Sequence, residues 1–270
     1  MKMVVLVENS SRCRLCAEHG LSVYIEYEGK TYLLDTGATA LFAENAKELG
    51  IDLSKVDTAF LSHAHYDHAN GMEKFFEINR KAPFYLQEGC GENCYFKKGF
   101  VRKYIGIPKG ITKKYQDRIK YVSGICPIAE GIYLVPHSTP HLEQIGKKEM
   151  MYQKTKLGWK PDNFCHEQSL VLDTDSGLVI FNSCSHGGVV NIINEVKAAF
   201  PEQKITALIG GFHIFRHPEA AIRELAKLIK ETGIQRIYTG HCSKERGYRI
   251  LREELGDMAG QFYVGMELEF

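Results

Sequence analysis

Residues 61–71 of the chain read Leu61-Ser62-His63-Ala64-His65-Tyr66-Asp67-His68-Ala69-Asn70-Gly71. They follow a run at 56–61 that is typical of a β-strand. On an extended loop, His63 and His65 point to the same side and can share one metal ion. Asp67 and His68 then turn back and offer an oxygen and a nitrogen to a second ion. Imidazole suits zinc and iron, and a carboxylate extends the choice to manganese, so the segment predicts a metal centre at a strand end.

The alternative is a surface cluster of histidines that binds no metal. Four such groups packed beside a buried strand without a ligand would leave polar atoms unsatisfied, at roughly 1–3 kcal/mol each. This cost favours the metal. A chain of 270 residues buries most of its apolar surface and needs neither metal nor disulfides merely to hold together. We therefore expect the metal to be catalytic rather than structural.

Strand-like and helix-like patterns alternate on both sides of this segment. Apolar and β-branched runs predict strands at 4–7, 22–28, 31–35, 56–61, 131–135, 169–173, 178–182, 205–209, 234–238 and within 261–270. Helical periodicity, ended by Gly or begun by Pro, predicts helices near 40–49, 189–200, 218–231 and 244–255, with a further helix after Gly71. Strands mixed with helices throughout imply an α/β protein built in layers. No repeat or linker divides the chain, so we expect a single domain over residues 1–270.

The spacing His-x-His-x-Asp-His after a strand resembles the signature of the metallo-β-lactamase superfamily. Leu33-Leu34-Asp35-Thr36-Gly37 resembles the first motif of that family, in which the aspartate, here Asp35, supports the metal loop from behind. Tyr238-Thr239-Gly240-His241-Cys242 resembles the last motif, whose histidine, here His241, completes the second metal. The resemblance implies a four-layer αββα sandwich. It also implies two metal ions at one edge between the sheets, with zinc expected and iron or manganese as alternatives.

The middle motifs depart from the commonest pattern of the superfamily. Many members have Thr-Gly-Asp, with an aspartate that bridges both metals, where this chain has Asn182-Ser183-Cys184. Cys184 is therefore expected to bind one metal through its thiolate. His186 is our choice for the third ligand of the first metal, because it lies on a glycine-flanked turn with the conformational freedom that a ligand loop needs. His166 competes for that role, since it precedes a strand much as the usual third histidine does.

A narrower branch of the superfamily, which includes archaeal dihydropterin–ribofuranosylaminobenzene phosphate synthases, is similar in further segments. These are Glu18-His19-Gly20-Leu21-Ser22, Cys184-Ser185-His186-Gly187-Gly188 and Gly210-Gly211-Phe212-His213. By this resemblance we expect Glu18 and His19 to contact the substrate. Asp67 is expected to orient the attacking nucleophile as well as to bind metal. His213 either stabilises the charge that develops on the attacked group or acts as an extra ligand.

The segment between Lys97 and Lys120 is strongly basic. It holds nine basic residues and a single acid, Asp117, with aromatic residues interleaved, and its periodicity is poor. This pattern predicts an inserted flap at about 90–125 rather than a core element. One interpretation is a lid that binds a small anionic substrate through Lys97, Lys98, Arg102 and Lys103. A solvated loop explains the composition equally well.

These features favour a metal-dependent hydrolase, in which a metal-activated water attacks a small anionic ester or phosphoester. The narrower branch suggests a transferase instead, joining a pterin methyl diphosphate to an aminobenzene ribonucleotide. A di-iron oxidoreductase is a third alternative, but the chain has no phosphate-binding glycine loop and would need a flavoprotein partner. A regulator without activity is the last alternative, and the metal ligands at loop ends argue against it.

Composition argues against several other classes. The net charge of +1 gives no general attraction to nucleic acid or to a membrane. No run of about 18 apolar residues exists, and the apolar N-terminal run is too short for a signal peptide. We expect a cytoplasmic protein with no nucleic-acid or membrane partner.

Four of the eight cysteines form two close pairs, Cys13 with Cys16 and Cys90 with Cys94. Together they offer the donors of a structural zinc site. Zinc-ribbon signatures combine two tight Cys-x-x-Cys pairs, however, and only the first pair has that spacing. Four reduced thiols are therefore the favoured interpretation.

Overall fold

The first β-sheet contains most strands of the N-terminal half in the computed structural model, which describes all 270 residues. Its seven strands lie in the order β18 (Glu267–Glu269), β1 (Lys2–Val7), β2 (Ser22–Tyr27), β3 (Lys30–Leu34), β4 (Thr58–Phe60), β5 (Phe84–Gln87) and β8 (Ile119–Val122). Strands β18 to β3 pair antiparallel, whereas β3, β4, β5 and β8 run parallel. Parallel strands end at the same edge of a sheet, so the loops that follow β3 and β4 are neighbours.

The second sheet has the same plan in the C-terminal half. Its seven strands lie in the order β17 (Ala259–Gln261), β16 (Arg236–Thr239), β15 (Ile205–Ile209), β14 (Gly177–Phe181), β13 (Gln168–Thr174), β10 (Ile132–Pro136) and β9 (Cys126–Ala129). Strands β14 to β17 run parallel, and β13, β10 and β9 are antiparallel. The loops after β14, β15 and β16 therefore also share one edge.

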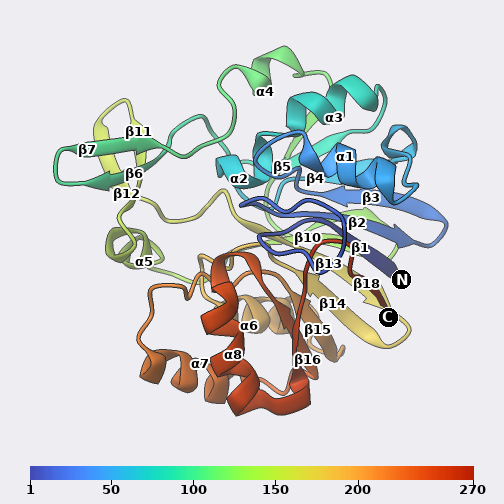
Figure 1. Cartoon of the computed structure of the whole chain (residues 1–270). Helices are drawn as coiled ribbons and strands as arrows, with labels where there is room; N and C mark the ends of the chain where they lie inside the picture. Colours follow the sequence, from blue (N-terminus) through green and yellow to red (C-terminus); the bar gives the residue numbers. More distant parts are fainter.

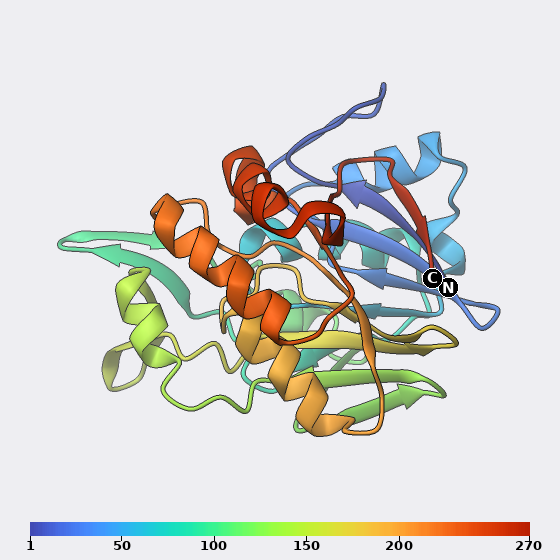
Figure 2. The same cartoon turned by 90° about the horizontal axis from the view of Figure 1, so that it is seen from below.

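Helices cover the outer faces of both sheets (Figures 1 and 2). On the side of the first sheet lie α1 (Leu41–Glu48), α2 (Tyr66–Ala69), α3 (Met72–Ile78), α4 (Ile111–Lys114) and the short 3-10 helix η1 (Leu53–Lys55). On the side of the second sheet lie α6 (Val189–Ala199), α7 (Glu219–Glu231), α8 (Lys244–Leu255) and the 3-10 helices η2 (His241–Ser243) and η3 (Gly256–Met258). No helix has the length and apolar character required to cross a membrane.

Three apolar clusters match the three interfaces between four layers. One joins α1 and α3 to the first sheet through residues such as Phe42, Phe75 and Leu33. A second lies between the sheets, and a third joins the second sheet to α6, α7 and α8. The expected αββα sandwich is confirmed. The predicted strands and helices lie within a few residues of the observed ones, because burial on one or both faces gives each of them a clear pattern.

Helix α7 illustrates how the pattern produces the packing. Ile222, Ala226 and Ile229 are spaced by four and three residues and are fully buried against the second sheet. The remaining positions are mostly charged and face solvent, as expected for an amphipathic surface helix. Pro218 precedes the first turn, where its missing N–H leaves no hydrogen bond unmade.

A third, four-stranded sheet projects from the sandwich (Figure 1). It is antiparallel, in the order β12 (Gly158–Pro161), β11 (Met151–Thr155), β6 (Cys94–Lys98) and β7 (Val101–Tyr104), and α5 (Glu143–Lys148) packs beside it. The predicted flap at about 90–125 was therefore wrong in its boundaries. Residues 94–104 form one hairpin of this sheet, and the later residues return to the sandwich as α4 and β8. Strand β8 is half-exposed at the sheet edge, so its sequence lacks an apolar pattern.

Candidate metal centre

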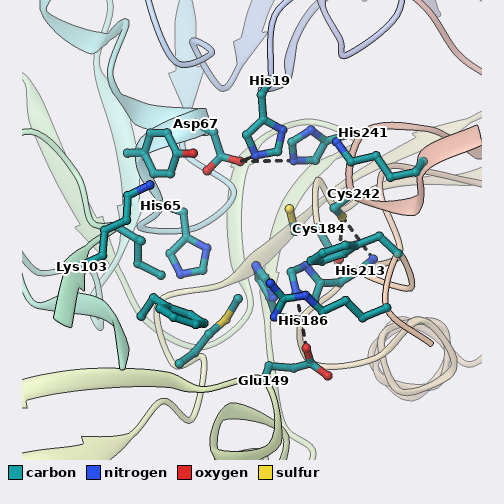
Figure 3. Close-up of a pocket in the computed structure, with 17 residues that line it drawn as sticks. His19, His65, Asp67, Lys103, Glu149, Cys184, His186, His213, His241 and Cys242 are labelled. Atoms are coloured by element: carbon teal, nitrogen blue, oxygen red, sulfur yellow. Dashed lines mark hydrogen bonds and ion pairs between the residues drawn. The ribbon is translucent and has the colours of Figure 1, made fainter. Parts of the chain in front are cut away.

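Six loops bring polar side chains to one edge of the sandwich, each soon after a strand ends, and Figure 3 labels side chains from the loops after β4, β14, β15 and β16. They supply Glu8 and Asn9 after β1, Asp35 after β3, His63, His65, Asp67 and His68 after β4, Cys184 and His186 after β14, His213 after β15, and His241 and Cys242 after β16. The strands hold these loops in place through their buried ladders. The loops themselves are free to adopt the irregular backbone that converging side chains require.

Asp67, His68, Cys184 and His241 have donor atoms at the spacing of one metal site. His68 Nε2 lies 3.2 Å from His241 Nε2 and 3.3 Å from Cys184 Sγ. Asp67 Oδ2 lies 3.7 Å from His68 Nε2 and 3.5 Å from His241 Nε2. Ligands about 2.0–2.3 Å from a tetrahedral zinc ion are separated by roughly 3.3–3.7 Å. The four groups therefore fit a single divalent ion.

Hydrogen bonds behind these rings leave the correct nitrogen free for an ion. His68 Nδ1 donates to Asp35 Oδ2 at 2.8 Å, so Nε2 keeps its lone pair. His241 Nδ1 donates to Asn9 Oδ1 at 3.1 Å, and its main-chain N–H donates to Glu8 Oε1 at 2.5 Å. Asp35 lies behind the metal loop, where the resemblance led us to expect it. Glu8 and Asn9 were not singled out from the sequence, although polar residues directly after an apolar strand are a usable signal.

His63, His65 and His186 converge beside the first set and fit a second ion. Their ligand atoms lie within 4.8 Å of one another. His63 Nδ1 contacts Ser62 Oγ at 2.8 Å, whereas His63 Nε2 and both ring nitrogens of His186 are buried without a hydrogen-bond partner. Burial and the neighbouring imidazoles hold the pKa of His63 and His186 well below the usual value, so both rings are neutral. Buried neutral imidazoles without partners suit a bound cation.

His166, the alternative third ligand, lies behind the metal loop. Its Nδ1 accepts the Ala64 N–H at 3.2 Å, and its Nε2 donates to Asp162 Oδ2 at 3.1 Å. Both of its ring nitrogens therefore have partners, in contrast to those of His186. The geometry favours His186 as the ligand and gives His166 a supporting role.

A buried ion-pair network holds the His186 loop. Glu167 accepts the main-chain N–H groups of His186 at 3.0 Å and of Gly187 at 2.9 Å. His137 bridges Glu167 and Glu195, with nitrogen–oxygen distances of 2.5 and 2.9 Å. Burial alone would lower the pKa of His137, but the two carboxylates outweigh it and raise this pKa to about 9. Sequence reasoning missed the network, because its members lie up to 58 positions apart.

Cys242 is a further donor that sequence reasoning did not single out. Its Sγ accepts the His213 N–H at 3.2 Å, and the ligand atoms of Cys184, His241 and Cys242 lie within 4.8 Å of one another. Burial would raise the pKa of Cys242, but contacts with Cys184 and His213 lower it to about 5. Its position directly after His241 in the sequence is the feature from which it could have been recognised as a donor.

Five residues of the two donor sets line a cavity of about 460 Å³, a volume that suits a small-molecule ligand: His65, Asp67, Cys184, His186 and His241. His19 lies at its wall, with Nε2 3.1 Å from Asp67 Oδ2 and its ring stacked on that of His241 at 5.1 Å between centroids. Apolar side chains and cations complete the lining: Phe96, Ile105, Met151, Phe215, Lys103, Arg216 and Lys244.

The fold and site have clear relatives. The sequence model of the metallo-β-lactamase superfamily matches residues 17–148, which include the metal loop. The crystal structure of a metal-dependent hydrolase of the β-lactamase superfamily superposes with a TM-score of 0.85 at 27% identity, over 100% of this chain and 99% of that one. Residues 17–148 thus match the metallo-β-lactamase superfamily, and the whole chain has the fold of a hydrolase of that superfamily.

Two further relatives are informative. The 7,8-dihydropterin-6-methyl-4-(β-D-ribofuranosyl)-aminobenzene-5'-phosphate synthase of Methanocaldococcus jannaschii is 28% identical over 274 residues, covering 94% of this chain and 90% of the synthase. The zinc-bound PqqB of Methylobacterium extorquens shares the fold, with a TM-score of 0.57 at 12% identity over the full length of both chains. The fold thus occurs with bound zinc.

Glu18 does not line the cavity of this metallo-β-lactamase fold, contrary to the sequence-based expectation. Its carboxylate accepts the N–H groups of Ala38 and Thr39 at 3.0 and 3.1 Å and the Thr39 hydroxyl at 2.7 Å. Glu18 therefore fixes the turn that follows Asp35. Its neighbour His19 does line the cavity.

Of the four basic residues expected at the substrate, only Lys103 lines the cavity. In the β6–β7 hairpin Phe96 pairs with Lys103, and Lys97 pairs with Arg102. Successive side chains of a strand alternate between faces, so the first pair faces the cavity and the second faces away. There Lys97 and Arg102 lie over aromatic rings of β11 and β12. Lys98 lies farther out, near the hairpin tip.

His213 lines the cavity beside His186. It adopts a left-handed backbone conformation with φ of 49°, and its ring centroid is 4.4 Å from that of His186. Nδ1 is buried without a partner, and Nε2 lies 3.9 Å from Glu149 Oε2. Burial would lower the pKa of His213, but Cys242 and Glu149 raise it. Through a ring N–H, His213 at the cavity wall can donate a hydrogen bond to an anionic group.

The two cysteine pairs do not come together as one zinc site. Cys13 contacts the Val264 carbonyl near the N-terminal loop, and Cys13 and Cys16 are exposed. Cys90 and Cys94 are buried in a different place, where Cys90 donates to the His166 carbonyl.

We expect the His186→Ala variant to lose about one of two bound ions, and His166→Ala to retain both. His186 offers unpartnered nitrogens to an ion, whereas both nitrogens of His166 are engaged. Elemental analysis of the purified proteins measures the ions per chain, with His141→Ala as the control because His141 is exposed. Equal losses in the His186 and His166 variants would contradict the assignment.

His137 makes stability depend on pH. Its pKa is about 9 in the folded protein against 6.5 as the ordinary value. The ion pairs therefore stabilise the fold fully below about pH 6.5, and this stabilisation is lost as pH rises through 9. The predicted loss is on the order of 2–3 kcal/mol. Urea unfolding of metal-free protein at pH 7 and pH 10 should show a smaller loss in His137→Gln than in the wild type, and equal losses would count against the network.

Proposed function

We propose that the chain is a metal-dependent hydrolase that acts on a small anionic ester or phosphoester. The observation that carries this proposal is two adjacent donor sets on the floor of one cavity whose lining includes Lys103, Arg216 and Lys244. The acidic groups in the cavity, Asp67 and Glu149, already contact histidines. A negatively charged substrate complements the remaining cations.

Zinc is the ion that the donor set supports best. Four-coordinate sites with imidazole, carboxylate and thiolate donors are typical of zinc. A thiolate donor also favours zinc or iron over manganese. Two such ions, when bound, would lower the pKa of a coordinated water and polarise the attacked group. The donor set and the zinc-bound relative of the same fold support this choice.

The chain's own residues then orient the reactants and move protons. Asp67 lies between His241 and His19, so it can accept a hydrogen bond on the cavity side while it binds metal. His213 donates to the oxygen on which charge develops. Lys103 and Lys244 hold an anionic group of the substrate that does not react.

A transferase is the second candidate, and one observation favours it. Phe96 and Phe215 line the same cavity as the cations, so a flat ring and an anionic group can bind together. The synthase relative at 28% identity supports a reaction of this kind. Both candidates need a metal centre. In the hydrolase it would activate water and stabilise the charge on the attacked group, from which an alcohol leaves; in the transferase it would stabilise the leaving pyrophosphate while the aromatic ribonucleotide attacks.

The test compares the two acceptors. Zinc-loaded protein is incubated with simple phosphomonoesters, phosphodiesters and thioesters, and separately with a pterin methyl diphosphate plus an aminobenzene ribonucleotide. Turnover of a simple ester that is lost in His65→Ala supports the hydrolase. Pyrophosphate release that requires both pterin and ribonucleotide, without ester turnover, would replace the hydrolase by the transferase.

The β6–β7 hairpin offers a matched pair of variants. Lys103→Gln should raise the KM for an anionic substrate by roughly twofold to fivefold, since an exposed charge pair is worth up to about 1 kcal/mol. The effect should fade as salt rises, because screening acts within about 8–10 Å. Lys97→Gln, on the opposite face of the hairpin, should leave KM unchanged. Both variants should keep their metal content, and equal KM values for both would remove Lys103 from the substrate site.

A further inference from the structure

The two ring nitrogens of His65 have different surroundings. Nε2 is fully buried and has no hydrogen-bond partner. The ring lines the cavity, so Nδ1 is the nitrogen open to the metal centre (Figure 3). If Nδ1 binds an ion, Nε2 must carry the proton of the neutral ring. A buried N–H without an acceptor is destabilising, because it has lost its hydrogen bond to water, so a partner for Nε2 is required.

A buried cluster lies on the side of His65 that faces away from the cavity. It consists of Cys94, Asp162 and His166, whose ligand atoms lie within 4.8 Å of one another and of a ring nitrogen of His65. All three are at most 1% exposed. Four such groups resemble another metal site, but the hydrogen bonds of His166 argue against one. Its Nδ1 accepts the Ala64 N–H, so its Nε2 carries the hydrogen that goes to Asp162 and has no lone pair for a metal.

Asp162 is the best acceptor in this cluster. Its Oδ1 accepts from Gln153 Nε2 at 2.9 Å and from the Phe164 N–H at 2.8 Å. Its Oδ2 accepts only from His166, at 3.1 Å, and a carboxylate oxygen has room for a second donor. The thiol of Cys94 is a much weaker acceptor.

We propose that Asp162 is a positioning residue that accepts the Nε2–H of His65 and so presents Nδ1 to the ion that His63, His65 and His186 would hold. This inference rests on the proposed metal-dependent function. The two side chains have ligand atoms within 4.8 Å of each other, so the ring or the carboxylate has to move closer to form the bond. Such a partner raises the basicity of a metal-bound imidazole and fixes its orientation.

The inference gives the third sheet a second role. Cys94 lies on β6, Gln153 on β11, and Asp162 directly after β12. The same sheet contributes Phe96 and Met151 to the wall of the cavity. The sheet therefore contacts the substrate on one side and holds a metal ligand on the other, and a displacement of its hairpins alters both.

The Asp162→Asn variant breaks only half of the contacts of Asp162. The amide oxygen can keep the bonds from Gln153 and Phe164, while the amide NH₂ meets the two histidine N–H groups with no lone pair. Gln153→Ala is the matched control, because it removes a bond on the other half of the carboxylate. The proteins are compared by zinc competition with a chromophoric chelator, and by urea unfolding of the metal-free forms.

We expect Asp162→Asn to weaken zinc binding by His63, His65 and His186 by about 10–100-fold, the usual cost of losing such a partner, and Gln153→Ala to change it by less than about threefold. Nitrogen NMR of zinc-loaded, histidine-labelled protein should show His65 bound through Nδ1 with a hydrogen-bonded Nε2 proton that Asp162→Asn shifts. Unchanged zinc affinity in Asp162→Asn, or a His65 bound through Nε2, overturns the inference and leaves the proposed function standing. A wild type that binds no zinc overturns both.

Discussion

The carboxylate of Asp35 is fully buried where the two sheets meet, and it accepts hydrogen bonds from loops of both. Ser62 donates its main-chain N–H and its hydroxyl, each at 2.7 Å, from the loop after β4, and Ser183 donates its hydroxyl at 2.6 Å from the loop after β14. The fourth donor is His68 Nδ1. An uncompensated buried charge costs several kcal/mol, so a shift between the sheets would be opposed by the loss of these bonds. Asp35 adopts a left-handed conformation with φ of 60°, which aspartate tolerates better than most residues.

Features encoded locally could be predicted from the sequence. The four residues His63 to His68 lie on one loop, so their spacing alone indicated the donor set, and Asp35 and His241 were found through short motifs. Most strands of the two large sheets were identified because a strand buried on both faces, such as β14, is a continuous apolar run, whereas the short strands β5, β8 and β9 were not. The choice of His186 over His166 agrees with the observed hydrogen bonds, although its role as a ligand stays a prediction.

Features that depend on distant pairing could not be predicted. The direction of each lysine in the β6–β7 hairpin depends on a register that only the partner strand defines, so Lys97 and Arg102 were placed at the substrate incorrectly. The hydrogen-bond partners of Glu18 and Glu8 could not be predicted either, because they lie far from these residues in the sequence. Glu8 meets His241 across 233 positions of the chain, and no local pattern marks such a contact.

The acidic residues of the site follow a common arrangement. Asp35 holds the ring of His68, and Glu8 and Glu167 hold the main chain of His241 and of His186. These three carboxylates are at most 2% exposed and lie behind the ligands rather than among them. The donor set itself contains one carboxylate, Asp67, because the position of the usual bridging aspartate is Cys184. Two divalent ions would therefore keep a net positive charge toward the cavity, which Lys103 and Lys244 increase. The buried acids orient the ligands and offset part of this charge from behind, so the attraction of the centre for anions is directed into the cavity.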